Sequence, residues 1–245
     1  KEIAKAGLPF MVCPGTSSWT THGSRLANSI ENVTNFANQG RKYGAEGLLN
    51  TDWGDKGHRN FLGVSLHSFA HGAAQSWNGK AVDNDKFTNN FCLHFFGQKD
   101  NRLSKMIQRL GSNYITCQTP IFNASFLFYG LFEDKASLEK RGTINVKGLK
   151  RIIEQSPDFE NISLPKETGS FTKLAIDEMQ LAQKMDMLAA KRILALKNSN
   201  ISELKKLSKP FEKMTEDFKS LWLMRNKQSR LKDNLVILGK ACKCV

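Results

Sequence analysis

The first 80 residues alternate short apolar runs with longer segments whose apolar side chains recur every three or four positions. Residues 8–13 and 45–50 are apolar runs with the length of buried strands. Residues 24–40 and 64–77 have helical spacing, and the first helix is expected to start at an N-cap, Ser24, and to end at a C′ glycine, Gly40. The pattern predicts strand, loop, helix, strand, loop, helix, with parallel strands and both loops at one edge of the sheet.

The remainder of the chain has the pattern of a helical region. Residues 80–90 are polar and are expected to form a linker. Apolar positions predict helices over four segments, namely residues 103–110, 147–154, 171–197 and 204–221. Pro210 is expected to kink the last of these helices or to divide it in two. The expected domains are therefore residues 1–80 and an α-helical C-terminal domain at residues 81–245.

Two parallel strands do not form a stable sheet alone, because parallel sheets are covered on both faces and paired at their edges. In a TIM (β/α)8 barrel of about 250 residues, each strand and helix unit takes about 30 residues. The expected fold class is therefore α/β: residues 1–80 are the last two units of such a barrel, followed by the mainly α-helical domain. The other six units are expected in an N-terminal barrel segment of the same protein, outside this chain.

The formal net charge of +13 is unevenly distributed, since residues 1–85 contribute +1 and the remaining residues +12. A basic helical region can bind nucleic acid, so a nucleic-acid-binding protein is one hypothesis for this chain. However, the Lys residues lie along amphipathic helices among Glu and Asp, without an Arg cluster between exposed aromatic residues. This distribution favours solvated helix faces. No apolar run approaches the roughly 20 residues of a membrane-spanning helix, so neither nucleic acid nor a membrane is an expected partner.

The cysteines do not have the spacing of metal ligands. There are five of them, at positions 13, 92, 117, 242 and 244. Reduced and partly buried thiols are the default for such a set. Neither a metal nor an organic cofactor is expected.

Residues 50–58 (Asn-Thr-Asp-Trp-Gly-Asp-Lys-Gly-His) place two carboxylates, a Trp, two glycines and a His directly after the second apolar run. Glycines let the backbone approach a ligand closely, and strand-end loops are where α/β folds place their chemistry. Trp53 offers a flat apolar face, and Asp52 and Asp55 offer hydrogen-bond acceptors, which together suit a sugar. The alternative is a tight loop in which Asp52 caps the next helix and Trp53 belongs to the core.

Two segments resemble a known family: residues 13–19 (Cys-Pro-Gly-Thr-Ser-Ser-Trp) and residues 51–58 (Thr-Asp-Trp-Gly-Asp-Lys-Gly-His). With the helix between them and residues 72–77 after them, they resemble the carboxyl-terminal part of the catalytic barrel of family 20 glycoside hydrolases, the β-N-acetylhexosaminidases. The similarity is dense over residues 8–78 and is greatest to bacterial-type members that have a helical domain after the barrel. Residues 222–226 (Trp-Leu-Met-Arg-Asn) give a weaker match near the end of those relatives.

The resemblance implies an enzyme that removes terminal N-acetylhexosamine residues from glycans by a substrate-assisted, retaining mechanism, in which the 2-acetamido oxygen attacks the anomeric carbon. An adjacent Asp-Glu pair assists that reaction in the family, and it lies after the fourth barrel strand. No pair in this chain matches it, because Asp177-Glu178 lies within a predicted helix and Glu133-Asp134 has the wrong order. The parent protein is thus expected to be a glycoside hydrolase, whereas this chain alone has no catalytic residue and is expected to be inactive.

The expected substrate-binding residues come from the two loops. The family has a Trp-x-Glu element whose Trp lines the sugar pocket and whose carboxylate holds distal hydroxyls, and Trp53 and Asp55 match it, with Asp in place of Glu. Four further candidates for the pocket wall are Trp19, His22, Asp52 and His58. Helix capping or loop packing is the alternative role for each of the four, and Trp77 is expected in the core. The alternative function is a non-catalytic carbohydrate- or protein-binding remnant.

Overall fold

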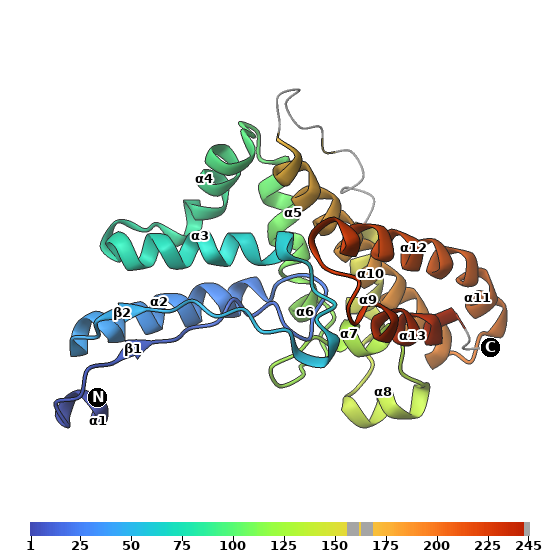
Figure 1. Cartoon of the computed structure of the whole chain (residues 1–245). Coiled ribbons are helices and arrows are strands. Elements are labelled where there is room, and N and C mark those ends of the chain that lie inside the picture. The colour runs from blue at the N-terminus through green and yellow to red at the C-terminus, as the bar shows by residue number, and fades with distance from the viewer. Residues whose placement is uncertain (156–161, 163–168, 243–245) are drawn as a thin grey trace.

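The computed structural model describes residues 1–155, 162 and 169–242, and these residues form a mostly helical fold (Figure 1). Its single sheet has two parallel strands, β1 (Met11–Val12) and β2 (Gly47–Leu48), with Met11 opposite Gly47 and Val12 opposite Leu48. The prediction that residues 1–80 form the last two units of a TIM barrel is therefore wrong. Only two residues of each apolar run pair as strand, and most buried apolar side chains lie on helices instead.

The predicted order of elements in the first 80 residues is confirmed. The elements are α1 (Glu2–Lys5), β1, α2 (Leu26–Tyr43), β2, the 3-10 helix η1 (Asp55–Gly57), α3 (Leu62–Asn78) and the 3-10 helix η2 (Gly79–Ala81). The predicted end of α2 is wrong, because the helix continues through Gly40 to a left-handed cap at Gly44, whose φ is 72°. Gly40 is needed for packing: a Cβ there would lie 3.0 Å from Val12 Cγ2.

Ten further helices lie in the described part of the chain after residue 81. They are α4 (Asn84–Phe96), α5 (Arg102–Leu110), α6 (Asn113–Thr116), α7 (Phe126–Gly130), α8 (Lys135–Arg141), α9 (Val146–Gln155), α10 (Ser170–Lys197), α11 (Ile201–Lys206), α12 (Ser208–Arg225) and α13 (Leu231–Cys242). The prediction of a polar linker at residues 80–90 is wrong in part, because α4 begins within it. Asp83 accepts hydrogen bonds from the amides of Asp85 and Lys86 and so caps this helix. The predicted helix at residues 204–221 is divided into α11 and α12, as expected. Pro210 lies in the first turn of α12, where a proline is tolerated.

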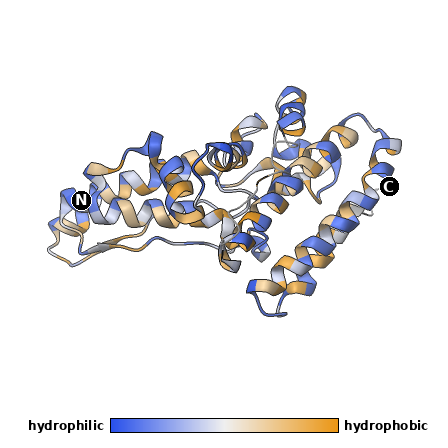
Figure 2. Ribbon diagram, turned by 90° about the horizontal axis from the view of Figure 1, so that it is seen from above, coloured by the Kyte–Doolittle hydropathy of each residue, from blue (hydrophilic) through white to orange (hydrophobic). Residues whose placement is uncertain are grey.

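Helix α10 is central to both hydrophobic clusters of the described residues. Leu188 and Ile193 of α10 pack in a cluster with α7, α9, α12 and α13, and Ala175 and Met179 of α10 pack in a second cluster with residues of α2 to α5. The ribbons carry hydrophobic residues on some sides and hydrophilic residues on others (Figure 2), as amphipathic helices do. None of the described helices has the length and hydropathy needed to cross a membrane.

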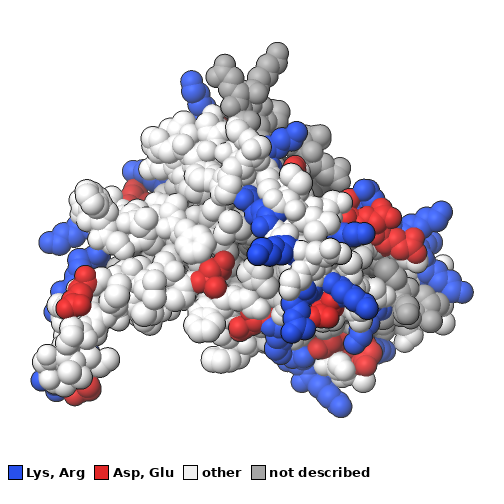
Figure 3. All heavy atoms as spheres, in the orientation of Figure 1, with Lys and Arg blue, Asp and Glu red and all other residues white. Residues whose placement is uncertain are grey.

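Charged side chains of both signs cover the C-terminal helices. On the face drawn in Figure 3, Lys and Arg stand among Asp and Glu on the side where α11 to α13 lie. Several of them form ion pairs within one helix, such as Lys206 with Glu203 and Lys213 with the half-buried Asp217. Mixed signs at helical spacing are typical of a solvated helix face.

The two strands and the residues beside them expose apolar side chains, and the strands leave edges unpaired among the described residues. Leu8 is 60% exposed, Met11 51% and Leu49 54%. Free strand edges and exposed apolar patches both promote association. We therefore expect the isolated chain to self-associate as its concentration rises in sedimentation velocity, and the double variant Met11→Lys, Leu49→Lys to associate less. Val236→Lys, a substitution of an exposed residue on α13, is the control. A monodisperse wild-type monomer at every concentration would contradict this.

Candidate functional site

The loops after the two strands lie side by side. Beyond β1 and β2, the amide of Thr51 donates to the Pro14 carbonyl oxygen at 2.8 Å, and the amide of Thr16 donates to the Thr51 carbonyl oxygen at 2.9 Å. Gly15 and Thr51 form an isolated parallel bridge. The polar loops that follow the two apolar runs therefore start at the same edge, as parallel strands require.

The loop at residues 51–58 has a constrained backbone. Three consecutive residues have positive φ, namely Lys56 at 56°, Gly57 at 102° and His58 at 54°. For Lys and His this conformation is unfavourable, and it persists only where the surroundings hold it. The surroundings are close on both sides: a Cβ on Gly57 would lie 2.7 Å from Asn234 Oδ1, and one on Gly54 would lie 2.6 Å from His58 Nδ1. The loop is thus held in one shape by its contacts.

Residues 53–57 of this loop are exposed, and Trp53 and Asp55 are the two predicted site residues among them. Trp53 is 54% exposed, and its indole N–H donates to Thr51 Oγ1 at 3.0 Å. Thr51 Oγ1 in turn donates to the Pro14 carbonyl oxygen at 3.0 Å. The alternative in which Trp53 belongs to the core is therefore excluded. The indole is anchored at its nitrogen while much of its surface faces solvent, and Asp55, two residues away, is also exposed.

Asp52 has a positioning role. Its Oδ1 accepts hydrogen bonds from Thr16 Oγ1 at 2.5 Å and from Ser65 Oγ at 3.2 Å. The carboxylate therefore joins the loop after β1, the loop after β2 and the first turn of α3. It bonds to a side chain of α3 and not to the backbone amides that a helix cap would satisfy.

His22 lies in the interior, where its partners come from the helical region. It is 1% exposed, and its Nδ1 lies 2.8 Å from Asp186 Oδ1 on α10. The other oxygen of Asp186 accepts from Asn113 Nδ2 at 2.9 Å. His22 therefore links the loop after β1 to α10, and it is not on the loop surface where Trp53 lies.

The other two candidates, Trp19 and His58, are intermediate in exposure between Trp53 and His22. Trp19 is half-buried, and its ring lies 5.0 Å from the Arg25 guanidinium carbon. His58 is half-buried beside Gly54. The prediction that Trp77 belongs to the core is wrong, because this residue in the last turn of α3 is 93% exposed.

The two acidic pairs rejected for catalysis have structural contacts. Glu178 lies within α10, as predicted, and its oxygens accept from Arg225 Nε at 2.6 Å and from the Gly63 amide at 2.7 Å. Glu133 forms an ion pair with Arg141 at 2.6 Å. Asp134 caps α8 by accepting from the Ser137 amide at 2.7 Å. Among the described residues, no group of His, Cys, Asp or Glu has the arrangement of a metal site.

The sequence pattern gave no indication of the cations around this loop. Arg59 is 2% exposed, and its guanidinium lies over the rings of Phe128 and Phe132, at 4.5 and 5.0 Å from their centroids. Burial lowers the pKa of Arg59 to about 10, so it remains protonated at neutral pH. Lys56 Nζ lies 5.3 Å from the Tyr129 ring centroid. No local pattern could indicate these contacts, because their aromatic partners lie about seventy residues away in the chain.

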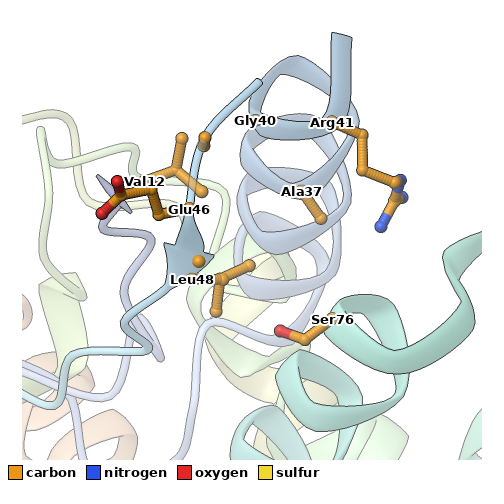
Figure 4. A pocket seen from close by; sticks show the side chains of 9 residues that line it. Val12, Ala37, Gly40, Arg41, Glu46, Leu48 and Ser76 are labelled. Carbon is orange, nitrogen blue, oxygen red and sulfur yellow. The ribbon is translucent and has the colours of Figure 1, made fainter. Parts of the chain in front are cut away.

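A small cavity lies at the opposite end of the strands. Its volume is about 180 Å³, and Val12, Ala37, Gly40 and Leu48 are among the residues that line it (Figure 4). Arg41 and Glu46 supply its charges. This lining is mostly aliphatic and glycine.

The sequence was compared with protein-family models and with curated proteins, and neither comparison gave a match. The geometry of the loops is therefore the basis for the function proposed below.

Proposed function

We propose that this chain supplies the sugar-binding loop of a β-N-acetylhexosaminidase and holds the terminal N-acetylhexosamine of a glycan through Trp53 and Asp55. The observation that supports this most is the exposed, anchored indole of Trp53. The hydrolytic Asp-Glu pair is supplied outside this chain. No residue described above has both the pairing and the position that the reaction requires.

The chemistry of a pyranose fits these two side chains. One face of the sugar presents C–H groups, which pack on an aromatic ring, and its edge presents hydroxyls, which donate to a carboxylate. Asp55 lies in the same turn as Trp53 and is exposed. Because Thr51 and Asp52 already tie the loop to Pro14, Thr16 and Ser65 by hydrogen bonds, little conformational entropy is lost on binding.

The role of the chain in the reaction is to bind and orient the sugar. In a substrate-assisted mechanism the acetamido group is the nucleophile, so the enzyme must hold the ring in the orientation that allows its attack. A sugar ring fixed against Trp53 by its apolar face and by Asp55 at its hydroxyls would meet that requirement. In this proposal neither residue transfers a proton.

We expect Trp53→Ala to weaken binding of chitobiose to the chain by about tenfold or more, which corresponds to about 1.4 kcal/mol. The reason is the loss of the apolar platform. Isothermal titration calorimetry at pH 7 measures the effect. Trp77→Ala is the matched control, because Trp77 is a highly exposed Trp on another element and should leave the affinity unchanged.

Two results would contradict the proposal. Equal affinities of the wild type and Trp53→Ala would show that the indole does not contact the sugar. Hydrolysis of an aryl N-acetylglucosaminide by this chain alone would show that it contains its own catalytic pair. Binding without activity in the longer enzyme would favour the alternative, a carbohydrate-binding remnant.

A further inference from the structure

Two histidines of α3 bond it to α4, which lies beside α3 at the outer edge of the view in Figure 1. His67 and His71 are one turn apart, so both side chains are on the same face of α3. The Nε2 of His67 lies 3.0 Å from Thr88 Oγ1, and the Nε2 of His71 donates to Asn84 Oδ1 at 2.8 Å. Asn84 and Thr88 are also one turn apart, so the two contacts join successive turns of both helices.

The two rings lie in a buried and largely aromatic space. His67 is 3% exposed and His71 is 0% exposed. The ring centroid of Phe87 lies 5.3 Å from that of His67 and 5.0 Å from that of His71, and the centroid of Phe91 lies 5.4 Å from that of His67. Each Nδ1 is buried without a hydrogen-bond partner. The site therefore accepts neutral rings, whereas protonation would bury a charge and a donor without an acceptor.

Protonation of both rings would carry a further cost. Their centroids are 6.5 Å apart, so two imidazolium ions would repel each other. Burial, and secondarily the neighbouring His71, lower the pKa of His67 to about 3. Burial also lowers the pKa of His71, although the hydrogen bond with Asn84 opposes this. The geometry and these shifts agree that the closed arrangement of α3 and α4 excludes protons.

No carboxylate compensates the two rings among the described residues, because neither ring is bonded to one. On α10, Asp177 is half-buried, and Glu178 is bonded to Arg225 and to the Gly63 amide. The other charged residues of α2, α4 and η2, which also pack against α3, are exposed. They are Glu31, Arg41, Lys42, Lys80, Asp85, Lys86 and His94.

We propose that His67 and His71 form an acid-sensitive latch, which holds α4 on α3 at neutral pH and releases α4 at acidic pH while the rest of the fold stays closed. The proton is taken up in the open state, where solvent reaches both rings, so the closed state need not admit it. Helix α3 itself stays in place, because its first turn is bonded to Asp52 and Glu178. The latch does not depend on the proposed sugar-binding function.

Two cysteines can distinguish release of α4 from unfolding of the whole chain. Cys92 lies on α4 and is 1% exposed, and burial raises the pKa of its thiol to about 12, so it is unreactive while α4 is closed. Cys117 is 0% exposed and belongs to the other hydrophobic cluster, with residues of α7 and α9. Release of α4 would expose Cys92 and leave Cys117 buried.

The test is labelling of the full chain with 4,4′-dithiodipyridine, a thiol reagent that also reacts at acidic pH. Mass spectrometry of peptides gives the rate for each cysteine, and each rate is divided by that of the same cysteine in the urea-unfolded chain at the same pH. We expect the relative rate of Cys92 to rise about 50-fold or more between pH 7 and pH 4.5, because each histidine that takes up a proton favours opening by about tenfold per pH unit below 6.5. Cys117 should stay protected.

The double variant His67→Phe, His71→Gln should lose this dependence on pH, since neither replacement titrates. His94→Gln, at an exposed position of α4, is the matched control and should keep it. The comparison of the two cysteines in the wild type needs no substitution, so the test holds even where the double variant does not fold.

Three results would overturn the latch. Labelling of Cys117 in step with Cys92 would show that acid unfolds the whole chain. A Cys92 that is as protected at pH 4.5 as at pH 7 would show that α4 is not released. The same dependence on pH in the double variant would assign the opening to other groups, such as the carboxyl of Glu178.

Discussion

Replacing Arg225 by leucine is expected to lower the free energy of unfolding by about 3–5 kcal/mol, the usual cost of removing one partner of a buried ion pair. Arg225 Nε donates to Glu178 Oε1 at 2.6 Å, and the side chains are 12% and 1% exposed. The second oxygen of Glu178 accepts from the Gly63 amide in the first turn of α3. The pair therefore joins α3, α10 and α12, and without Arg225 a carboxylate would remain buried.

Urea denaturation at pH 7 measures this effect. Burial raises the pKa of Glu178, and its hydrogen bond from Arg225 opposes that rise. Without Arg225 the pKa of Glu178 should rise further. Adding Glu178→Gln to Arg225→Leu should then restore part of the stability, since it removes the charge. Arg230→Leu is the control, because Arg230 and Asp233 form an exposed pair that should contribute little. An Arg225 variant as stable as the Arg230 variant would exclude a structural role for the pair.

Lowering the pH from about 6.5 to about 3 is expected to remove about 4–5 kcal/mol of stability through His67 alone, at about 1.36 kcal/mol per pKa unit. Burial, and secondarily the neighbouring His71, lower the pKa of His67 from 6.5 to about 3. The ring lies between Phe87 and Phe91, and its Nε2 is 3.0 Å from Thr88 Oγ1. The unfolded chain therefore takes up a proton that the folded chain does not, so stability is complete above pH 6.5 and is lost as the pH falls.

Stability measured by urea denaturation across this pH range tests the prediction. Burial also lowers the pKa of His71, although its hydrogen bond with Asn84 opposes this, so His71 should add to the loss in the same direction. His67→Phe keeps an aromatic ring and should flatten the dependence of stability on pH. His94→Phe, at an exposed position of α4, should leave the slope unchanged. Identical slopes for the wild type and His67→Phe would show that the pKa of His67 is the same in the folded and the unfolded chain, which would contradict the prediction.

Several helices could be predicted from the sequence because helical periodicity is local, whereas α4, α6, α7, α8 and α13 were not predicted. The spacing of apolar residues indicated α2, α3, α9 and α10 to within a few residues. The positions of the two strands were predicted as well, but their length and their surroundings were not. An apolar run shows that a segment is hydrophobic, but it does not show what covers it, and Met11 and Leu49 are exposed in the fold. The predicted barrel depended on that missing information.

For the candidate site too, local features could be predicted from the sequence and the exposure of side chains could not. The sequence by itself determined that the residues at 51–58 form a turn-rich loop after an apolar run, because glycines and short polar side chains favour turns locally. Only the tertiary structure decided which of its side chains reach solvent. Asp52 is engaged by Thr16, 36 residues away, and His22 is engaged by Asp186, 164 residues away, while Trp53 and Asp55 remain exposed. Burial depends on contacts between distant segments, and no local pattern encodes those contacts.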